Sequence, residues 1–147
     1  VISLLGRVFM NTLKCPFETV KDILKDIKDK ANVVIVDIHA EATSEKIAMG
    51  WFLDGEVSAV VGTHTHIQTA DERILPQGTA YITDVGMSGP YDSILGRRKE
   101  QVLVRFLTQM PTRFEVAGDD VRLCGLLFDV DVTSGKSTSL RRLQELL

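Results

Sequence analysis

All three histidines of the chain stand where Val-rich segments end. His64 and His66 follow one such segment with a single residue between them, and His39 follows another. In an extended backbone, residues i and i+2 point to the same side about 7 Å apart, so His64 and His66 can face one small volume. Neutral imidazole is the commonest transition-metal ligand. The three residues therefore predict a metal site.

The same pattern also has a second interpretation. A His-x-His pair can consist of two hydrogen-bonding loop residues, and a lone histidine can end a strand without binding an ion. The segments 33–38 and 57–61 are near-continuous Val/Ile runs without alternation, which is typical of buried parallel strands. Ligands of open α/β sheets bind beyond the carboxyl ends of such strands. This placement favours the metal-site interpretation.

Carboxylates near the histidines could touch an ion or orient an imidazole. Each is more often a solvated loop charge or a helix-start residue, but together they indicate a polar pocket. A hydrolytic metal centre also needs a coordinated water, an electrophile held on the ion and a proton donor for the leaving group, and three histidines supply only part of that. The candidate carboxylates are Asp37, Glu41, Asp71 and Asp84.

Length and composition predict one globular domain. A chain of 147 residues with 44% hydrophobic residues can bury a core without disulfides, and a net charge of -3 gives no sign of a nucleic-acid partner. Cys15 and Cys124 are far apart and form no Cys-x-x-Cys motif, so we expect reduced thiols and a cytoplasmic protein. No stretch resembles a signal peptide or a membrane span. The first residue is Val1 rather than Met, and we expect a fragment of a longer protein.

Hydrophobic periodicity and turn residues predict an α/β fold that begins with parallel strand-helix-strand units and ends with antiparallel strands. Cys15 and Pro16 mark the start of the first helix, and Asp54 and Gly55 the end of the second. In order, we expect a strand within 1–10, a helix over 17–30, a strand over 32–38, a helix from Thr43 or Ser44, a strand over 57–61, a hairpin of 73–75 and 79–83, an irregular loop over 84–92, a helix over 97–110, and strands over 113–117, 121–133 and 137–146.

Other catalytic motifs are missing. The segment 135–138 reads Gly-Lys-Ser-Thr, but a phosphate-binding loop needs a glycine five residues before the Gly-Lys pair, and Val130 stands there. We therefore expect a turn at 135–138. The sequence contains no Gly-x-Gly-x-x-Gly fingerprint and no nucleophile elbow.

Three blocks carry a family resemblance. They are DIHAEATSEK at 37–46, VVGTHTHIQTAD at 60–71 and TDVGMSGP at 83–90, and the order and spacing of these blocks make a chance match improbable. Together with LGRVFM at 5–10 they resemble the YmdB-like family of calcineurin-type metallophosphoesterases. The similarity runs essentially from end to end of the chain.

The resemblance implies a four-layer α/β metallophosphoesterase sandwich, two divalent metal ions (iron or manganese), and a phosphodiesterase that opens 2′,3′-cyclic nucleotides or similar phosphodiesters. It implies His39 and His64 as ligands of one ion and His66 as a ligand of the other. Residues bordering the substrate would be Gly86, Met87 and Ser88. The family's remaining ligands and its general-acid histidine belong to an N-terminal half that no part of this chain matches.

The resemblance therefore makes 1–147 the C-terminal portion of a metallophosphoesterase domain, with no catalytic acid of its own, and we expect the chain alone to be inactive. The expected partner is a small phosphodiester or cyclic nucleotide. The sequence does not decide whether the chain forms a homo-oligomer. Two alternatives remain. One is a non-catalytic truncated scaffold that serves assembly or regulation. The other, an amidohydrolase, needs an eight-fold barrel for which the chain is too short.

Overall fold

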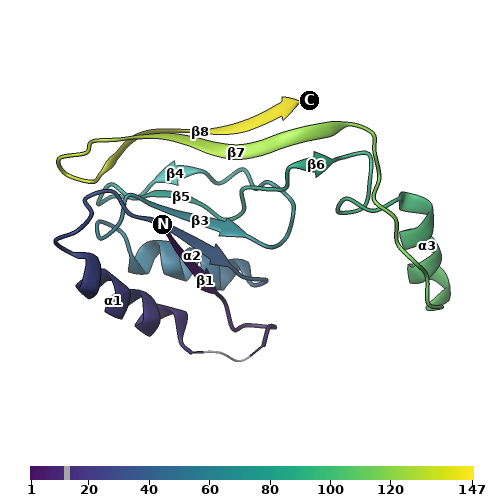
Figure 1. The fold of residues 1–147 in the computed structure, drawn as a ribbon, viewed down its shortest axis with the longest axis horizontal. Coiled ribbons are helices and arrows are strands. Elements are labelled where there is room, and N and C mark those ends of the chain that lie inside the picture. Colours follow the sequence, from purple (N-terminus) through teal and green to yellow (C-terminus); the bar gives the residue numbers. More distant parts are fainter. Residues whose placement is uncertain (12–13) are drawn as a thin grey trace.

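The computed structural model describes residues 1–11 and 14–147. A five-stranded sheet has the order β1-β2-β3-β5-β4, and a second sheet has the order β6-β7-β8 (Figure 1). In the first sheet, β1, β2, β3 and β5 are parallel and β4 is antiparallel to β5. The strands of this sheet are β1 (Ile2–Leu5), β2 (Ile35–His39), β3 (Ala59–Thr63), β4 (Arg73–Ile74) and β5 (Ala80–Ile82).

Helices α1 (Pro16–Ile27) and α2 (Thr43–Phe52) cover one face of the parallel strands (Figure 1). They lie on the same face because β1, β2 and β3 are added in one direction and such crossovers are right-handed. The buried core fills the space between these helices and the sheet. Its fully buried members include Val20, Val36, Ile38, Met49, Leu53, Val60 and Tyr81.

The antiparallel sheet lies over the other face of the parallel one (Figure 1). It consists of β6 (Gly89–Pro90), β7 (Val121–Val130) and β8 (Ser137–Leu146). Hydrogen bonds join the two sheets, among them Ser137 Oγ to the Ser58 carbonyl at 2.8 Å. The expected α/β fold, parallel at first and antiparallel later, is confirmed.

Several predicted boundaries were wrong for local reasons. The first helix ends at Ile27 rather than at residue 30, because residues 28–30 are charged and bury nothing on the sheet. The predicted strand over 113–117 forms only a single bridge among the described residues, from Val116 to Arg97, because Arg97 itself lies outside any named strand. The loop over 84–92 contains the short strand β6, which pairs with β7.

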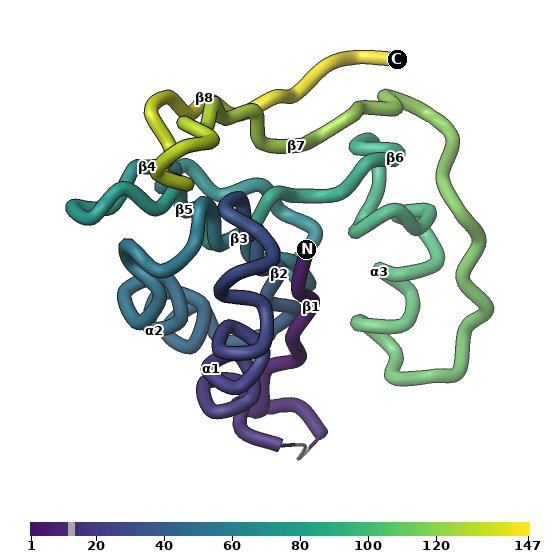
Figure 2. The backbone as a smooth tube through the Cα atoms, turned by 60° about the vertical axis from the view of Figure 1, so that its left-hand side comes forward, coloured from purple at the N-terminus to yellow at the C-terminus, as the bar shows by residue number. Residues whose placement is uncertain are grey.

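Helix α3 (Lys99–Thr108) stands away from the parallel sheet (Figure 2). The apolar spacing correctly predicted a helix here, but only Val102 is buried. Phe106 is 66% exposed and Leu107 is 82% exposed. No helix among the described residues is long and apolar enough to cross a membrane. The predicted free thiols are confirmed, with Cys124 buried and Cys15 partly exposed.

The turn expected at 135–138 lies slightly earlier, at 132–134, because Ser137 already pairs with Val130 as the first residue of β8. Gly135 has a φ of 72° and an added Cβ would lie 2.3 Å from the Asn32 carbonyl oxygen, so only glycine fits. The Gly135 amide donates to the Asp131 carbonyl, which closes the connection between β7 and β8. Residues 131–135 thus form a tight reversal of the chain.

Gly62, in β3, has less room for an added Cβ than any other glycine of the chain. A Cβ there would lie 1.8 Å from the Thr83 carbonyl oxygen and 2.7 Å from Lys46 Cδ. We expect Gly62→Ala to lower the free energy of unfolding by about 3 kcal/mol, because the backbone of β3 and of residue 83 would have to separate. Gly118→Ala is the matched control, since nothing lies within 4 Å of its added Cβ. Urea unfolding measures both, and equal stabilities of the two variants would contradict the expectation.

Candidate functional site

The register between β2 and β3 brings two histidines together. His39 is the last residue of β2 and pairs with Thr63, the last residue of β3, so the residue that follows Thr63 lies beside His39. His64 Nδ1 is 2.9 Å from His39 Nε2, and the two rings are nearly perpendicular with centroids 4.7 Å apart. The predicted meeting of these two imidazoles at the carboxyl edge of the sheet is present.

A chain of hydrogen bonds defines which nitrogen of His39 carries its proton. The Thr63 hydroxyl donates its one hydrogen to Asp37 Oδ1 at 2.9 Å. His39 Nδ1 lies 3.1 Å from the same hydroxyl oxygen, so it must be the donor in that contact. A neutral ring with its proton on Nδ1 leaves a lone pair on Nε2. That lone pair points at His64.

Glu41 has the corresponding effect on His64. Its Oε2 is 2.9 Å from His64 Nε2, and a carboxylate accepts a hydrogen bond from the N–H there, so the lone pair of a neutral ring is on Nδ1. Two lone pairs 2.9 Å apart repel each other unless a proton or a cation lies between them. Two nitrogens each about 2.1 Å from one ion, at a right angle, are about 3 Å apart. His39 and His64 therefore fit as adjacent ligands of one transition-metal ion.

His66 lies two residues further along the same loop, but its side chain is exposed. Its backbone has a φ of 66°, and within the described part of the chain the contact between imidazole rings is that of His39 with His64. Residues 1–11 and 14–147 contain no group of three or more His, Cys, Asp or Glu side chains placed to hold an ion. The structure thus brings His39 and His64 together, and the convergence of all three rings stays a prediction.

The predicted substrate-bordering residues follow β5. The Gly86 amide donates to Asp84 Oδ1 at 2.9 Å, and its φ of 82° suits glycine. The Met87 carbonyl accepts a bond from the Tyr91 hydroxyl at 3.3 Å, and Ser88 is exposed. Gly86 is connected to the histidine loop through Asp84, which also binds Thr65.

Asp71 does not touch the histidines, contrary to its expected role as an orienting carboxylate. It accepts hydrogen bonds from the Thr69 hydroxyl at 2.6 Å, from the Thr83 amide at 3.2 Å and from the Thr83 hydroxyl. Asp71 therefore anchors the loop after β3 to β5. The orienting role belongs to Asp37, acting through Thr63, and to Glu41.

Sequence reasoning missed Lys46, Thr65 and Gln68. Lys46 is fully buried beneath the histidine loop, and Gln68 Nε2 donates towards the carbonyls of Gly125 and Leu143, joining that loop to the antiparallel sheet. One signal was present for Lys46. It precedes Met49 and Gly50 by three and four residues, which places it on the sheet-facing side of α2.

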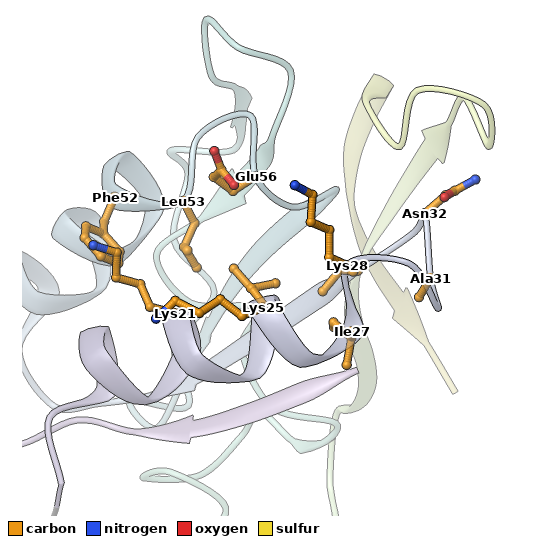
Figure 3. A pocket seen from close by; sticks show the side chains of 11 residues that line it. Lys21, Lys25, Ile27, Lys28, Ala31, Asn32, Phe52, Leu53 and Glu56 are labelled. Carbon is orange, nitrogen blue, oxygen red and sulfur yellow. The ribbon is translucent and has the colours of Figure 1, made fainter.

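A cleft of about 600 Å³ lies elsewhere, between α1 and the end of α2 (Figure 3). It is lined by Lys21, Lys25, Lys28 and Phe52 among others, and by no histidine. Val34, which precedes β2, also lines it, so the cleft lies at the amino-terminal edge of the parallel strands. It is separate from the paired imidazoles at the opposite edge.

The parallel sheet with imidazoles beyond its carboxyl edge defines an α/β protein with a candidate cation site. A family model described as "YmdB-like protein" matches residues 1–143, and the chain belongs to this family. It is 50% identical over 143 residues to the 2′,3′-cyclic-nucleotide 2′-phosphodiesterase of Bacillus subtilis (strain 168), covering 97% of this chain and 54% of that protein. It is 44% identical over 122 residues to a putative phosphatase/phosphodiesterase of Mycoplasma pneumoniae, covering 82% and 43%.

Solved structures show the same fold. A hypothetical protein from Thermus thermophilus matches with a TM-score of 0.90 and 42% identity, over 98% of this chain and 56% of that one. A novel phosphatase from Mycoplasma pneumoniae matches with a TM-score of 0.89 and 39% identity, over 98% and 52%. The chain spans about half the length of these relatives. The family resemblance and the fold class predicted from the sequence are confirmed.

Acid stability tests the network around Asp71. Burial raises the pKa of Asp71, but hydrogen bonds from Thr69 and Thr83 outweigh burial, and the folded-state pKa lies below the ordinary 3.8. The unfolded chain therefore takes up this proton first, so the contribution of Asp71 to stability is full above pH 3.8 and is lost as the pH falls through the folded-state pKa. We expect Asp71→Asn to be less stable at pH 7 by about 1–3 kcal/mol and to lose less stability on acidification.

The measurement is urea unfolding at several pH values. Asp26→Asn, at an exposed position of α1, is the control for the same change of charge. An Asp71→Asn variant whose stability falls with pH as steeply as that of the unaltered chain would contradict the expectation.

Proposed function

We propose that this chain is part of a metal-dependent phosphodiesterase that hydrolyses 2′,3′-cyclic nucleotides or similar phosphodiesters. The observation that carries the proposal is the facing pair of nitrogens, His39 Nε2 and His64 Nδ1, 2.9 Å apart. The other nitrogen of each ring is engaged by Thr63 or Glu41, so only the facing nitrogens are free to bind an ion. The relative from Bacillus subtilis, 50% identical, is named for this activity.

In this proposal His39 and His64 hold one divalent ion, and His66 is a ligand of a second, with iron or manganese as the metals. When bound, such ions polarise phosphoryl oxygens and lower the pKa of coordinated water. His66 is exposed, which leaves its ring free to turn towards an ion. Gly86, Met87 and Ser88 border the substrate in this arrangement, on the segment that follows β5.

A division of the site between two parts of a longer protein completes the proposal. Three histidines are too few for two ions, because each ion of such a centre takes several protein ligands. We infer that residues 1–147 form the C-terminal portion of a metallophosphoesterase domain. The other ligands and the general acid then belong to the part of the relatives that this chain does not match. A cytoplasmic location and the inactivity of the isolated chain stay predictions.

One observation favours the alternative of a non-catalytic scaffold for assembly. Leu103, Phe106 and Leu107 of α3 are 49%, 66% and 82% exposed, which is unusual for three neighbouring large apolar side chains. Light scattering of the purified chain would show whether it forms a homo-oligomer. The hydrolysis experiment below separates the two functions, because a scaffold does not hydrolyse a phosphodiester.

Metal titration tests the proposed centre directly. We expect the chain to bind Mn²⁺ in calorimetric titration and His64→Ala to abolish binding, because that ring carries one of the two facing nitrogens. Glu41→Gln should weaken binding about 10–100-fold, because the amide no longer orients His64 as a carboxylate does. Lys136→Ala, in the exposed turn after β7, is the control and should bind normally.

The hydrolytic part of the proposal needs the complete domain. The chain joined to the remaining half of a family member should hydrolyse bis(p-nitrophenyl) phosphate when Mn²⁺ is present, and His64→Ala should abolish this activity. A joined protein that binds Mn²⁺ but does not hydrolyse the ester would favour the scaffold.

A further inference from the structure

We propose that the buried ion pair Lys46–Asp84 is a positioning clamp that holds the loop His64–Thr65–His66 in the conformation that binds a cation. The inference rests on the proposed cation site. Lys46 and Asp84 are 0% and 1% exposed, and Lys46 Nζ lies 2.8 Å from Asp84 Oδ2. The two side chains bond to Thr63 and Thr65, so the pair acts through the residues on either side of His64 and not on an imidazole.

The pair holds the residues on both sides of His64. Lys46 Nζ donates to the Thr63 carbonyl at 2.8 Å. Asp84 Oδ2 accepts both the Thr65 amide at 2.9 Å and the Thr65 hydroxyl at 2.7 Å. The backbone at His64 is thus held at both neighbours, Thr63 and Thr65. The two side chains that hold it are themselves bonded to each other.

The loop needs such a restraint because its backbone is strained. His64 has a φ of 108° and His66 a φ of 66°, both in the region that favours glycine. A non-glycine residue held there costs about 1–3 kcal/mol and persists only when its surroundings determine the conformation. Thr65 is the residue between the two strained positions, and it makes two bonds to Asp84. Without them, the loop is free to relax and to move His64 away from His39.

Stability alone does not explain a buried ion pair. Taking both charges out of water costs several kcal/mol per ion, and apolar replacements of such pairs are often neutral or stabilising. The neighbouring backbone also makes room for it, since a Cβ on Gly62 would lie 2.7 Å from Lys46 Cδ. The pair therefore serves geometry, and the geometry that it controls is that of the histidine loop.

The test compares two Thr→Val variants of the 147-residue chain. Thr65→Val removes the hydroxyl bond to Asp84. Thr79→Val is the matched control, because the Thr79 hydroxyl is fully buried and donates to the Val57 carbonyl at 2.7 Å, next to the start of β3 and away from the histidines. We expect Thr65→Val to lower the affinity for Mn²⁺ about tenfold, as loss of a group that orients metal ligands does. Thr79→Val should lower the melting temperature and leave Mn²⁺ affinity unchanged.

Two further measurements separate positioning from general destabilisation. Thr65→Ser keeps the hydroxyl and should restore the affinity for Mn²⁺. In the metal-free chain, hydrogen exchange at the amide of residue 65 should be slow and should become faster in the double variant Lys46→Met/Asp84→Asn, which removes both buried charges.

If the unaltered chain binds Mn²⁺ but Thr65→Val and Thr79→Val bind it with equal affinities, the proposed clamp is overturned. Unchanged exchange at residue 65 in the folded double variant would overturn it as well. An unaltered chain that does not bind Mn²⁺ would overturn the proposed function first, and this inference with it.

Discussion

The pairing register between β2 and β3 is the constraint on which the rest of the site depends. His39 is paired with Thr63, so both strands end at the same edge and the next residue, His64, meets His39 across the gap between them. Side chains alternate along a strand, and a slip of one residue would turn each side chain of β3 to the opposite face of the sheet. The contact between Thr63 and Asp37 would then be lost together with the orientation of His39. Burial of Val36 and Val60 on the core face holds the register in place.

Local sequence signals predicted the parts of this arrangement that depend on neighbours in the chain. The Val/Ile runs indicated the parallel strands, and three residues containing Gly78 predicted the hairpin of β4 and β5, which is present. The positions of His39 and His64 followed from these elements. Helix and strand ends were less accurate, as with α1, because an end is set by what the sheet can still bury. The named relatives and the shared fold confirm the family but do not test the ligands.

Other features depend on partners far away in the chain. Lys46 looks like an ordinary helix lysine until Asp84, 38 residues later, is placed above it. The φ of 66° at His66 is a further feature that no propensity predicts. The apolar spacing of α3 predicted the helix but not the exposure of its apolar face, because that spacing is the same whether the face is covered or not.

Threonine hydroxyls connect the carboxylates of this edge to the backbone and to one imidazole. Thr63 donates to Asp37, Thr65 to Asp84, and Thr69 and Thr83 to Asp71. A hydroxyl has one hydrogen, so once it is given to a carboxylate the oxygen can only accept from its other neighbours. The χ1 of a β-branched side chain is stiff, which makes threonine a better fixed donor than serine. In this way Asp37 determines the proton position on His39 without touching it, and the free nitrogen of His39 faces His64.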